Sequence, residues 1–381
     1  MNVETLQRRG YSIHALREMA RRRLPRMVFD IADGAAGDEN TLRANEADLA
    51  EIRFLQKVLT GAPVRNQSVD LLGLKLPSPV IIGPTGLAGL FWPQAEMATA
   101  RAAARFGTIY TTSHASTSTL EEIAAASPGP KWMQVFLYKD RSLTYEFADR
   151  AKAAGYAGLV LTVDNQVMAV RDRDARNGMT FPVRWGPRNL VDFALRPGWL
   201  ARMARTPNPT FVNYGERASI GAFGALMADQ LDPGVTWRDV EALRKRWVGP
   251  MIIKGLLHPD EARRAADVGA DAIVVSNHGG RQLDAAISSI RALPAIVDAV
   301  GARLPILIDG GFRRGIDVIK ALALGARAVM LGRPHLWGVA CAGEAGAFWA
   351  LELYRREIDR AMALGGWDDL GDVSRAEIAG R

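Results

Sequence analysis

The sequence predicts an α/β protein folded as a closed (β/α)8 barrel. From residue 79 onward, short apolar segments typical of buried strands alternate with Ala-rich segments of helical periodicity. Eight strands are predicted, over residues 79–84, 108–112, 132–138, 158–163, 251–254, 272–276, 306–309 and 328–331. Eight strand–helix repeats are typical of this barrel. A doubly wound sheet, the alternative, would need fewer units and an early dinucleotide Gly fingerprint that this sequence lacks.

The predicted helices lie between these strands and on either side of the barrel. They cover residues 93–106, 119–126, 142–154, 236–247, 259–268, 289–300 and 315–324, with a final helix over about 338–363. Residues 1–78 begin with a helix over 6–23 and retain apolar residues, so we expect a helical cap packed on the barrel. The barrel spans 79–363 and a C-terminal tail spans 364–381, which makes 1–381 a single domain.

A long insertion, residues 165–235, separates the fourth strand from its helix. It carries Trp185, Phe193, Trp199 and Phe211 among Pro, Gly and Arg residues. Connections of this length are usually functional or disordered. Two interpretations are open, a mobile lid over the site or a membrane contact made by the Arg and aromatic side chains.

The composition is that of a globular protein with a modest positive charge. Of 381 residues, 48% are hydrophobic and 23% are charged, and 48 Lys and Arg against 41 Asp and Glu give a net charge of +7. The basic residues are scattered and no basic patch is interleaved with aromatic residues, so nucleic acid is not an expected partner. The charge suits an anionic substrate, a phosphate-bearing cofactor or an anionic membrane surface.

The chain has one cysteine, Cys341, and five histidines that are far apart in the sequence. A single cysteine excludes a disulfide within the chain, and we expect Cys341 to be a small core residue. No His/Cys cluster has zinc spacing, so no metal site is expected. The sequence shows neither a signal-peptide pattern nor an apolar run that could span a bilayer, and the expected location is cytoplasmic.

The sixth predicted strand leads into the segment 276–284, Ser-Asn-His-Gly-Gly-Arg-Gln-Leu-Asp. In this type of barrel, functional groups lie at the carboxyl ends of the strands. His278 is suited to move a proton near neutral pH, and Arg281 is suited to bind a carboxylate or phosphate. The two Gly residues between them let the backbone approach a ligand closely. The segment therefore predicts a base and an anion clamp that act on a small acid.

Other strand ends carry residues suited to a ligand. The first strand ends in a Gly-rich turn, 83–89, which leaves room for a flat ligand. The third strand carries Gln134, a buried amide that must bond to neighbouring backbone or to a ligand. The fourth ends at Asp164, which is either a helix cap or the carboxylate that orients a base. The fifth ends at Lys254, which we expect to stabilise a ligand or its charge.

Two segments that combine Gly with Arg follow strands seven and eight, at 309–313 and 331–333. Loops after these two strands often bind phosphate in such barrels. Backbone amides of Gly and an Arg fork at a helix start form an anion site. Two such segments on adjacent loops are stronger evidence of a phosphate site than one segment alone.

Together these segments resemble the FMN-dependent α-hydroxy acid oxidases and dehydrogenases, a family that includes glycolate oxidase, the flavin-type lactate dehydrogenases and mandelate dehydrogenase. The resemblance covers nearly the whole chain, through residues 24–30, 84–86, 276–284 and 331–333. It implies a barrel fold, FMN as the cofactor, and oxidation of an α-hydroxy acid to the 2-oxo acid with the flavin as electron acceptor.

The resemblance also implies a role for each matching residue. His278 matches the base that removes a proton from the substrate, Asp164 the carboxylate that holds its imidazole, and Lys254 the cation near the flavin. Arg281 and Arg171 match the pair that binds the substrate carboxylate. The positions that match cofactor contacts are Thr85, Gly86, Ser113, Gln134, Thr162, Lys254, Ser276, Asp309, Gly311, Arg313, Gly332 and Arg333.

Two departures from the family pattern concern the substrate. Where the family has two substrate-binding Tyr residues, this sequence has Ile31 and Phe136. Loss of both hydroxyls implies a more apolar pocket, while the Arg pair still requires an anionic group. We therefore expect a bulky or aromatic α-hydroxy acid, mandelate- or lactate-like. The alternative is an FMN barrel that tailors or isomerises a larger metabolite.

The resemblance leads to further expectations about the electron acceptor and the assembly. Gly86 stands where the oxidases commonly have Ala and several dehydrogenases have Gly, which favours a quinone over oxygen as the acceptor. Family members are often tetramers, so we expect a homotetramer. If residues 165–235 contact a membrane, the cytoplasmic protein would lie peripherally on its inner face.

Overall fold

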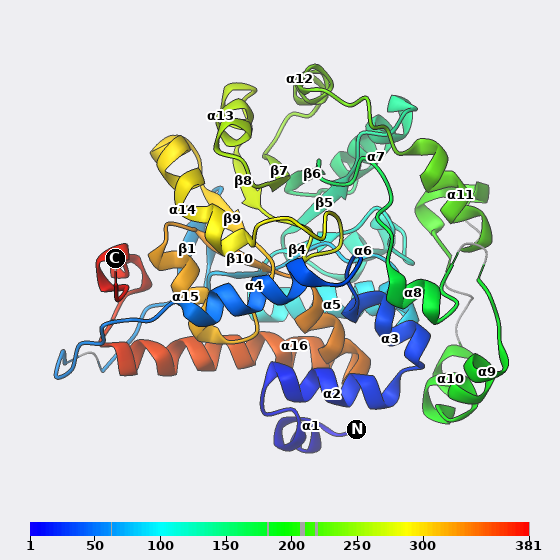
Figure 1. Cartoon of the computed structure of the whole chain (residues 1–381), viewed down its shortest axis with the longest axis horizontal. Helices are drawn as coiled ribbons and strands as arrows, with labels where there is room; N and C mark the ends of the chain where they lie inside the picture. The colour runs from blue at the N-terminus through cyan, green and yellow to red at the C-terminus, as the bar shows by residue number, and fades with distance from the viewer. Residues whose placement is uncertain (62, 181–182, 206–209, 218–219, 381) are drawn as a thin grey trace.

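The computed structural model describes residues 1–61, 63–180, 183–205, 210–217 and 220–380. At its centre, eight parallel strands form a closed barrel in the order β10-β3-β4-β5-β6-β7-β8-β9, and helices surround it (Figure 1). Successive strands are neighbours, and the last strand pairs with the first. The predicted fold class is confirmed.

The barrel strands and helices alternate along the chain as predicted. The strands are β3 (Val80–Ile82), β4 (Tyr110–Thr112), β5 (Lys131–Val135), β6 (Gly158–Thr162), β7 (Met251–Leu256), β8 (Ala272–Val275), β9 (Ile306–Ile308) and β10 (Ala328–Leu331). The helices are α5 (Ala95–Phe106), α6 (Leu120–Ala126), α7 (Arg141–Ala153), α12 (Trp237–Arg246), α13 (Pro259–Asp267), α14 (Ser289–Val300), α15 (Gly315–Ala323) and α16 (Arg333–Gly365). Each predicted strand segment overlaps one observed strand, although β5 begins one residue before its segment and β7 ends two residues after its segment.

The remaining elements form the cap, the insertion and short turns. The cap contains α1 (Val3–Arg9), α2 (Ile13–Arg23), α3 (Arg26–Asp33), α4 (Asn40–Glu51), β1 (Val69–Leu71) and β2 (Leu74–Leu76). The insertion contains α8 (Asp172–Arg176), α9 (Pro187–Ala194), α10 (Pro197–Met203), α11 (Ile220–Gln230) and the 3-10 segment η2 (Val212–Arg217). Other 3-10 turns are η1 (Ala88–Leu90), η3 (Gly301–Arg303), η4 (Leu370–Asp372) and η5 (Arg375–Glu377).

Alternation along the strands divides the barrel interior into an apolar layer and a polar layer. Apolar side chains from the strands form one buried cluster, which includes Trp132, Val160, Ile252, Val274 and Leu307. Because side chains alternate with a period of two, residues two positions further along point to the same side. These residues are, in the same order, Gln134, Thr162, Lys254, Ser276 and Asp309. Predicted site residues therefore converge at the carboxyl end of the barrel.

A hairpin closes the other end of the barrel. Strands β1 and β2 pair antiparallel, and their residues Val69, Leu71 and Leu76 belong to the same buried interior cluster. The interior is thus packed with apolar side chains below the polar layer, and a ligand has to enter from the carboxyl end.

The cap is helical, but its first helix is shorter than predicted. Helix α1 ends at Gly10, and α2 begins after Ser12, whose hydroxyl accepts a hydrogen bond from Ala15 N at 3.1 Å. A Cβ at residue 10 would approach the Leu16 side chain to 2.7 Å, so packing requires a Gly at this break. The expected single helix over 6–23 is therefore wrong.

The last helix is longer than predicted. It begins at Arg333 rather than 338, because Gly332 caps it and Pro334 fits the first turn, where no backbone N–H is needed. The helix is interrupted at Ala342 and Gly343, whose φ is +57°.

The insertion 165–235 is largely helical rather than a plain loop. Pro187 and Pro197 occupy first turns, where proline favours a helix start. Helices α9 and α10 lie at the edge of the molecule, away from the barrel strands (Figure 1). Parts of the predicted loop, 181–182, 206–209 and 218–219, lie outside the described residues. Among the described helices, none is both long and apolar enough to span a bilayer.

Candidate active site

A cavity of about 290 Å³ opens at the carboxyl end of the barrel and gathers most of the predicted site residues. Those that line it are Ile31, Thr85, Gly86, Ser113, Gln134, Phe136, Thr162, Arg171, Lys254, His278, Arg281, Asp309, Gly311, Arg313, Gly332 and Arg333. The other two, Asp164 and Ser276, lie behind the lining and bond to His278 and Lys254 respectively.

His278 and Asp164 form a hydrogen-bonded pair, with His278 Nδ1 3.0 Å from Asp164 Oδ1. Burial favours the neutral form of Asp164, but His278 and Lys254 outweigh it and lower the pKa of this carboxyl. An ionised carboxylate only accepts, so Nδ1 carries the hydrogen and Nε2 keeps a lone pair. Burial lowers the pKa of His278, with Lys254 adding to the effect and Asp164 opposing it. Nε2 is therefore a base at neutral pH, and Asp164 orients it rather than capping a helix.

The backbone at His278 is in the left-handed region. The φ angles of His278, Gly279 and Gly280 are +58°, +65° and +77°. Such conformations in a non-Gly residue are costly and concentrate at functional sites. A Cβ at Gly280 would lie 2.6 Å from Leu42 N, so the second Gly is required by packing against the cap.

Two other residues of the segment 276–284 bind the cap. The side chains of Asn277 and Asn45 exchange two hydrogen bonds, of 2.9 and 2.8 Å. Asp284 accepts hydrogen bonds of 3.0 Å from the backbone nitrogens of Asp38 and Thr41, next to the start of α4. Sequence reasoning missed both roles, because the partners are far away in the chain and nothing local indicates them.

Lys254 is a buried cation next to the predicted cofactor residues. Its Nζ lies 3.0 Å from Asp309 Oδ2 and donates to Ser276 Oγ at 2.9 Å. Burial disfavours the charged form, but Asp309 and Asp164 outweigh it and raise the pKa of Lys254. The ammonium group can therefore stabilise negative charge on a ligand.

Arg171 and Arg281 line the cavity close to a third group, Asp174. Burial lowers the pKa of both arginines, and repulsion from Arg171 and Arg333 adds to the large lowering at Arg281. Among the described residues, Arg171 Nε and Asp174 Oδ1 are buried without hydrogen-bond partners. Crowded guanidinium groups with unused donors favour an anionic ligand. Sequence reasoning missed Asp174, although its position three residues after Arg171 on α8 is a usable signal.

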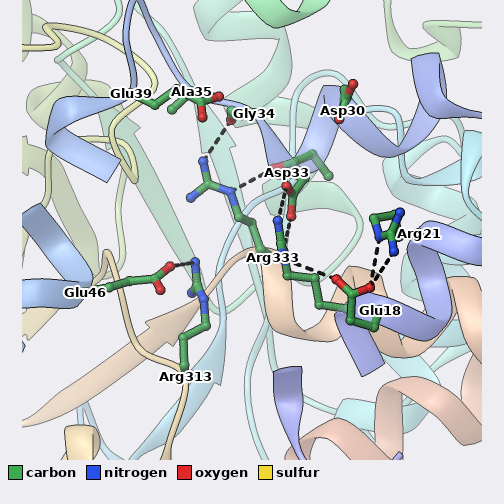
Figure 2. Close-up of polar contacts among 12 residues, drawn as sticks. Glu18, Arg21, Asp30, Asp33, Gly34, Ala35, Glu39, Glu46, Arg313 and Arg333 are labelled. Atoms are coloured by element: carbon green, nitrogen blue, oxygen red, sulfur yellow. Dashed lines mark hydrogen bonds and ion pairs between the residues drawn. The ribbon is translucent and has the colours of Figure 1, made fainter. Parts of the chain in front are cut away.

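Arg313 and Arg333 both reach from the barrel toward the cap (Figure 2). Arg313 forms an ion pair of 2.9 Å with Glu46. Burial and the charge of Arg313 lower the pKa of Arg333 to about 10. Arg333 donates three hydrogen bonds of 2.8, 2.9 and 3.0 Å to the backbone oxygens of Ala32, Gly34 and Gly279. A guanidinium has five N–H donors, so both arginines fasten the cap and retain donors for an anion.

A known family matches this chain almost from end to end. The family is described as FMN-dependent dehydrogenase, and the match covers residues 20–380. The chain belongs to the FMN-dependent dehydrogenase family. The L-lactate dehydrogenase of Caulobacter vibrioides is 43% identical over 370 residues, 96% of either chain.

Solved structures are also similar to this FMN-dependent dehydrogenase. The monotopic membrane protein (S)-mandelate dehydrogenase has a TM-score of 0.94 and 36% identity, over 97% of this chain and 99% of that chain. A soluble mutant of the membrane-associated (S)-mandelate dehydrogenase from Pseudomonas putida has a TM-score of 0.85 and 35% identity, over 98% and 100% of the two chains.

The phosphate end of FMN fits the start of α16. Gly332 is the N-cap residue of this helix, and a Cβ at that position would meet no atom within 4 Å, so open space adjoins the helix terminus. Backbone N–H groups at a helix start lack partners within the helix and favour a phosphate. Arg313 and Arg333 line the cavity on the same side. These residues suit a phosphate group.

The flavin ring fits the polar layer of the barrel. Among the described residues, Thr162 Oγ1 and Asp309 Oδ1 are buried there without hydrogen-bond partners. A flavin carries donors and acceptors around its pyrimidine edge, which such atoms can satisfy. Lys254 lies beside Asp309 and can offset negative charge on the reduced ring.

Apolar side chains line another part of the cavity, next to the polar His114 and Asn165. Ile31 and Phe136 are 9% and 5% exposed and both line the cavity. The insertion adds further apolar residues to the wall. Sequence reasoning singled out Phe211 among them but missed Met168, Met179, Met227 and Leu231. The last two are four residues apart across the end of α11, which places them on one helix face and is the signal that could have identified them.

The described residues contain no cluster of three or more His, Cys, Asp or Glu side chains that could hold a metal ion. Cys341 is buried, as predicted, and burial raises the pKa of its thiol to about 12. The thiol is therefore protonated and unreactive at neutral pH.

Proposed function

We propose that this FMN-dependent dehydrogenase oxidises a bulky or aromatic α-hydroxy acid to the 2-oxo acid. The observation that carries the proposal is that His278, oriented by Asp164, shares one cavity with Arg171, Arg281 and Lys254. In the reaction the substrate loses the hydrogens of C2 and of the 2-hydroxyl, and a carbon–oxygen double bond forms. Bound FMN accepts the two electrons.

The side chains of this chain perform the remaining steps. Arg171 and Arg281 bind the substrate carboxylate and fix C2 relative to His278. His278 Nε2 takes a proton from the substrate, and Asp164 stabilises the imidazolium that results. Lys254 offsets the negative charge that follows electron transfer to the cofactor.

The cofactor contacts predicted from the sequence remain part of the proposal. FMN is proposed to contact Thr85, Gly86, Ser113, Gln134, Thr162, Lys254, Ser276, Asp309, Gly311, Arg313, Gly332 and Arg333. Support comes from the cavity lining, to which all of them except Ser276 belong, and from the unpartnered atoms of Thr162 and Asp309.

The substrate side chain is proposed to lie against Ile31 and Phe136. Both residues lack the hydroxyl that the family resemblance associates with these positions, and the insertion adds Met and aromatic side chains to the wall. An apolar wall of this kind favours a phenyl or branched group over a methyl group. The similar proteins include an L-lactate dehydrogenase, whose substrate carries a methyl group, and an (S)-mandelate dehydrogenase, whose substrate carries a phenyl group.

Anaerobic mixing with a panel of aliphatic and aromatic 2-hydroxy acids tests this function. The flavin absorbance should bleach, fastest with aromatic acids. If no acid of the panel bleaches it, the proposed function is wrong. The alternative, an isomerase or tailoring enzyme, requires net conversion of a metabolite without an electron acceptor, and the similarities to lactate and mandelate dehydrogenases do not favour it.

Substitution His278→Ala separates the role of the base from cofactor binding. We expect flavin reduction to slow by about 10²- to 10⁴-fold, the usual contribution of a general base. FMN should remain bound, since its proposed contacts are intact. Stopped-flow bleaching and the flavin-to-protein absorbance ratio measure the two effects, and loss of FMN would show that His278 is misassigned.

We further propose that the insertion contacts a membrane surface. Residues exposed on it include Val167, Val170, Trp185, Leu190, Val191, Leu195 and Leu200, each 39–73% exposed. Arg184 and Arg188 lie on the same segment, and amphipathic segments of this kind bind anionic interfaces. A similar structure is that of a monotopic membrane protein, and residues 165–235 would then hold the cytoplasmic protein on the inner face of a membrane.

Co-sedimentation with anionic phospholipid vesicles tests the contact. The Trp185→Ser/Leu190→Ser variant should lose most vesicle binding. The control is Val58→Ser/Leu59→Ser, which removes two apolar residues that are 70% and 102% exposed in the cap. Equal binding by both variants and the native protein would rule out the contact.

The acceptor and the assembly are proposed from the family resemblance. A quinone is the proposed electron acceptor and oxygen the slower one, and the proposed assembly is a homotetramer of 41.4 kDa chains. Reoxidation of the reduced flavin by a soluble quinone and by oxygen can be compared directly. Light scattering measures the mass of the assembly.

A further inference from the structure

Three polar side chains meet at the cavity, and one of them, His114, lines it. Tyr138 Oη lies 2.7 Å from Tyr214 Oη and 3.1 Å from His114 Nδ1, and Tyr214 Oη also contacts Nδ1. All three residues are buried. His114 follows β4, Tyr138 follows β5, and Tyr214 comes from the insertion, so only the folded chain brings them together.

His114 adjoins the residue that has lost its hydroxyl. The centroids of the His114 and Phe136 rings are 4.5 Å apart in an edge arrangement. Both side chains line the same cavity as His278. A polar side chain therefore stands beside the apolar ring of Phe136, on the neighbouring strand.

The contacts of the three residues allow a tautomer of His114 that carries its hydrogen on Nε2. If Nδ1 accepts a proton from one phenol, the other phenol can donate to the first, and both hydroxyls have an acceptor within the trio. If Nδ1 carried the hydrogen, one phenol would have no acceptor within the trio. Each arrangement pairs two of the three hydrogens within the trio; the first pairs both hydroxyl hydrogens and leaves the imidazole hydrogen on Nε2.

We propose that His114 is a substrate-recognition residue whose imidazole N–H, oriented by Tyr138 and Tyr214, binds an oxygen of the substrate head group in place of the hydroxyl that Phe136 lacks. The inference rests on the proposed function, since it names a contact to the same α-hydroxy acid. The recognised oxygen is either a carboxylate oxygen or the oxygen on C2.

His114 serves as a hydrogen-bond donor and not as a second base. Burial and the charge of His278 lower its pKa to about 3, so the imidazole is neutral at working pH. Substitutions of His114 should therefore weaken substrate binding. They should not shift the pH dependence of flavin reduction, which comes from His278.

Titration of the oxidised holoenzyme with unreactive ligands tests the contact through the flavin spectrum. Phenylglyoxylate carries a carboxylate and a C2 oxygen, whereas phenylacetate carries the carboxylate alone. We expect His114→Leu to weaken phenylglyoxylate binding about tenfold, the usual effect of one neutral hydrogen bond. His114→Gln keeps an N–H donor and should recover part of the affinity. Weaker phenylacetate binding as well would place the contact at the carboxylate.

Tyr214→Phe removes an orienting hydroxyl without touching the imidazole. We expect a loss of affinity for the same ligand, smaller than that of His114→Leu. Tyr156→Phe is the matched control, because its buried hydroxyl bonds to Thr112 Oγ1 and Leu120 O outside the cavity lining. Native-like affinity for both ligands in His114→Leu, or equal losses in the two Tyr variants, would overturn the proposal.

These titrations do not depend on turnover. If no hydroxy acid bleaches the native flavin, the proposed function fails, while binding of both ligands can still be measured. If the native protein is reduced normally and His114→Leu binds both ligands as tightly as the native protein, only the recognition proposal fails. If His114→Leu does not retain FMN, the ligand affinities of Tyr214→Phe and Tyr156→Phe are compared instead. Equal affinities would then overturn the recognition proposal.

Discussion

In the proposed function, proton transfer depends on one pair, His278 and Asp164. The base has to be neutral to act, and burial together with Lys254 holds its pKa below the ordinary value near 6.5. Asp164 works in the opposite direction, because its charge favours the imidazolium. The rate of flavin reduction should therefore rise with pH through a limb that lies below 6.5 and be level at neutral pH.

Substitution Asp164→Asn tests this balance. Removing the carboxylate removes the contribution that raises the pKa of His278, while burial and Lys254 remain, so the limb should move to lower pH. The rate of flavin reduction at neutral pH, where it no longer depends on pH, should also fall by roughly 10²-fold. The reason is that the imidazole loses its orientation and the stabilisation of its protonated form. Stopped-flow reduction between pH 4.5 and 8 measures both effects. A limb displaced to higher pH would contradict the assignment.

At the scale of elements, the turn after β3 is tightly packed. A Cβ at Gly86 would lie 2.9 Å from Ala115 Cβ and 3.4 Å from Ala115 O, closer than side chains normally approach. Gly86 also stands where the resemblance separates oxidases from dehydrogenases. A substitution there therefore changes the packing of two loops as well as the surroundings of the cofactor.

Gly86→Ala should change reoxidation of the flavin by oxygen more than its reduction by substrate. Because the added methyl group displaces the turn, the single variant should also lose some stability or FMN affinity. The double variant Gly86→Ala/Ala115→Gly relieves the contact. It should regain stability and FMN affinity while its reoxidation by oxygen stays altered. Reduction and reoxidation rates, measured separately, test this. Equal changes in both half-reactions of the double variant would contradict it.

The cap and the segment 276–284 stabilise each other through Asp284. This carboxylate accepts hydrogen bonds from backbone groups at the start of α4, which otherwise lack partners. Asp284→Ala should lower the free energy of unfolding by about 1–2 kcal/mol, as for loss of a helix cap. Asp284→Asn keeps an acceptor oxygen and should cost less.

Urea unfolding monitored by circular dichroism measures these losses. The control is Asp298→Ala, which removes an exposed ion pair with Arg375 and should cost less than about 1 kcal/mol. A loss at Asp284 no larger than at Asp298 would show that the contact to α4 contributes little.

At the scale of the whole molecule, buried histidines make the fold sensitive to acid. His335 donates from Nδ1 to Leu331 O at 3.1 Å, and burial lowers its pKa to about 4; burial lowers that of His114 to about 3. The unfolded chain binds protons near pH 6.5, so it gains stability relative to the folded chain as pH falls below that value. The stability that these residues provide is complete above pH 6.5 and is lost as pH falls toward their folded-state pKa values.

Each of these histidines should reduce the free energy of unfolding by about 1.4 kcal/mol per pH unit below 6.5, hence about 3 kcal/mol for the two between pH 6 and 5. His335→Gln should lower this slope by about 1.4 kcal/mol per pH unit, whatever its stability at pH 7. Chemical unfolding at several pH values measures the slope. An unchanged slope would mean that His335 is protonated in the folded chain.

Local patterns were enough to predict the barrel and the residues of its polar edge. Apolar runs and helical periodicity depend on neighbouring residues, so eight strands could be counted without a structure. Their positions at or after strand ends then placed Lys254 and Asp309 at the carboxyl end of the barrel, and the family resemblance added Thr162. Irregular features were harder to predict. At the break between α1 and α2, the need for Gly at position 10 comes from contact with Leu16, which no local pattern shows.

The sequence by itself determined the fold class, the family and the chemical type of the site, because these follow from residue type and spacing. The tertiary structure decided which groups meet. It joined Asn277 to Asn45 and set His114 beside Phe136 with two phenols from other segments. Such contacts join residues far apart in the chain, and their geometry depends on how the cap and the insertion pack on the barrel. No local pattern encodes that packing.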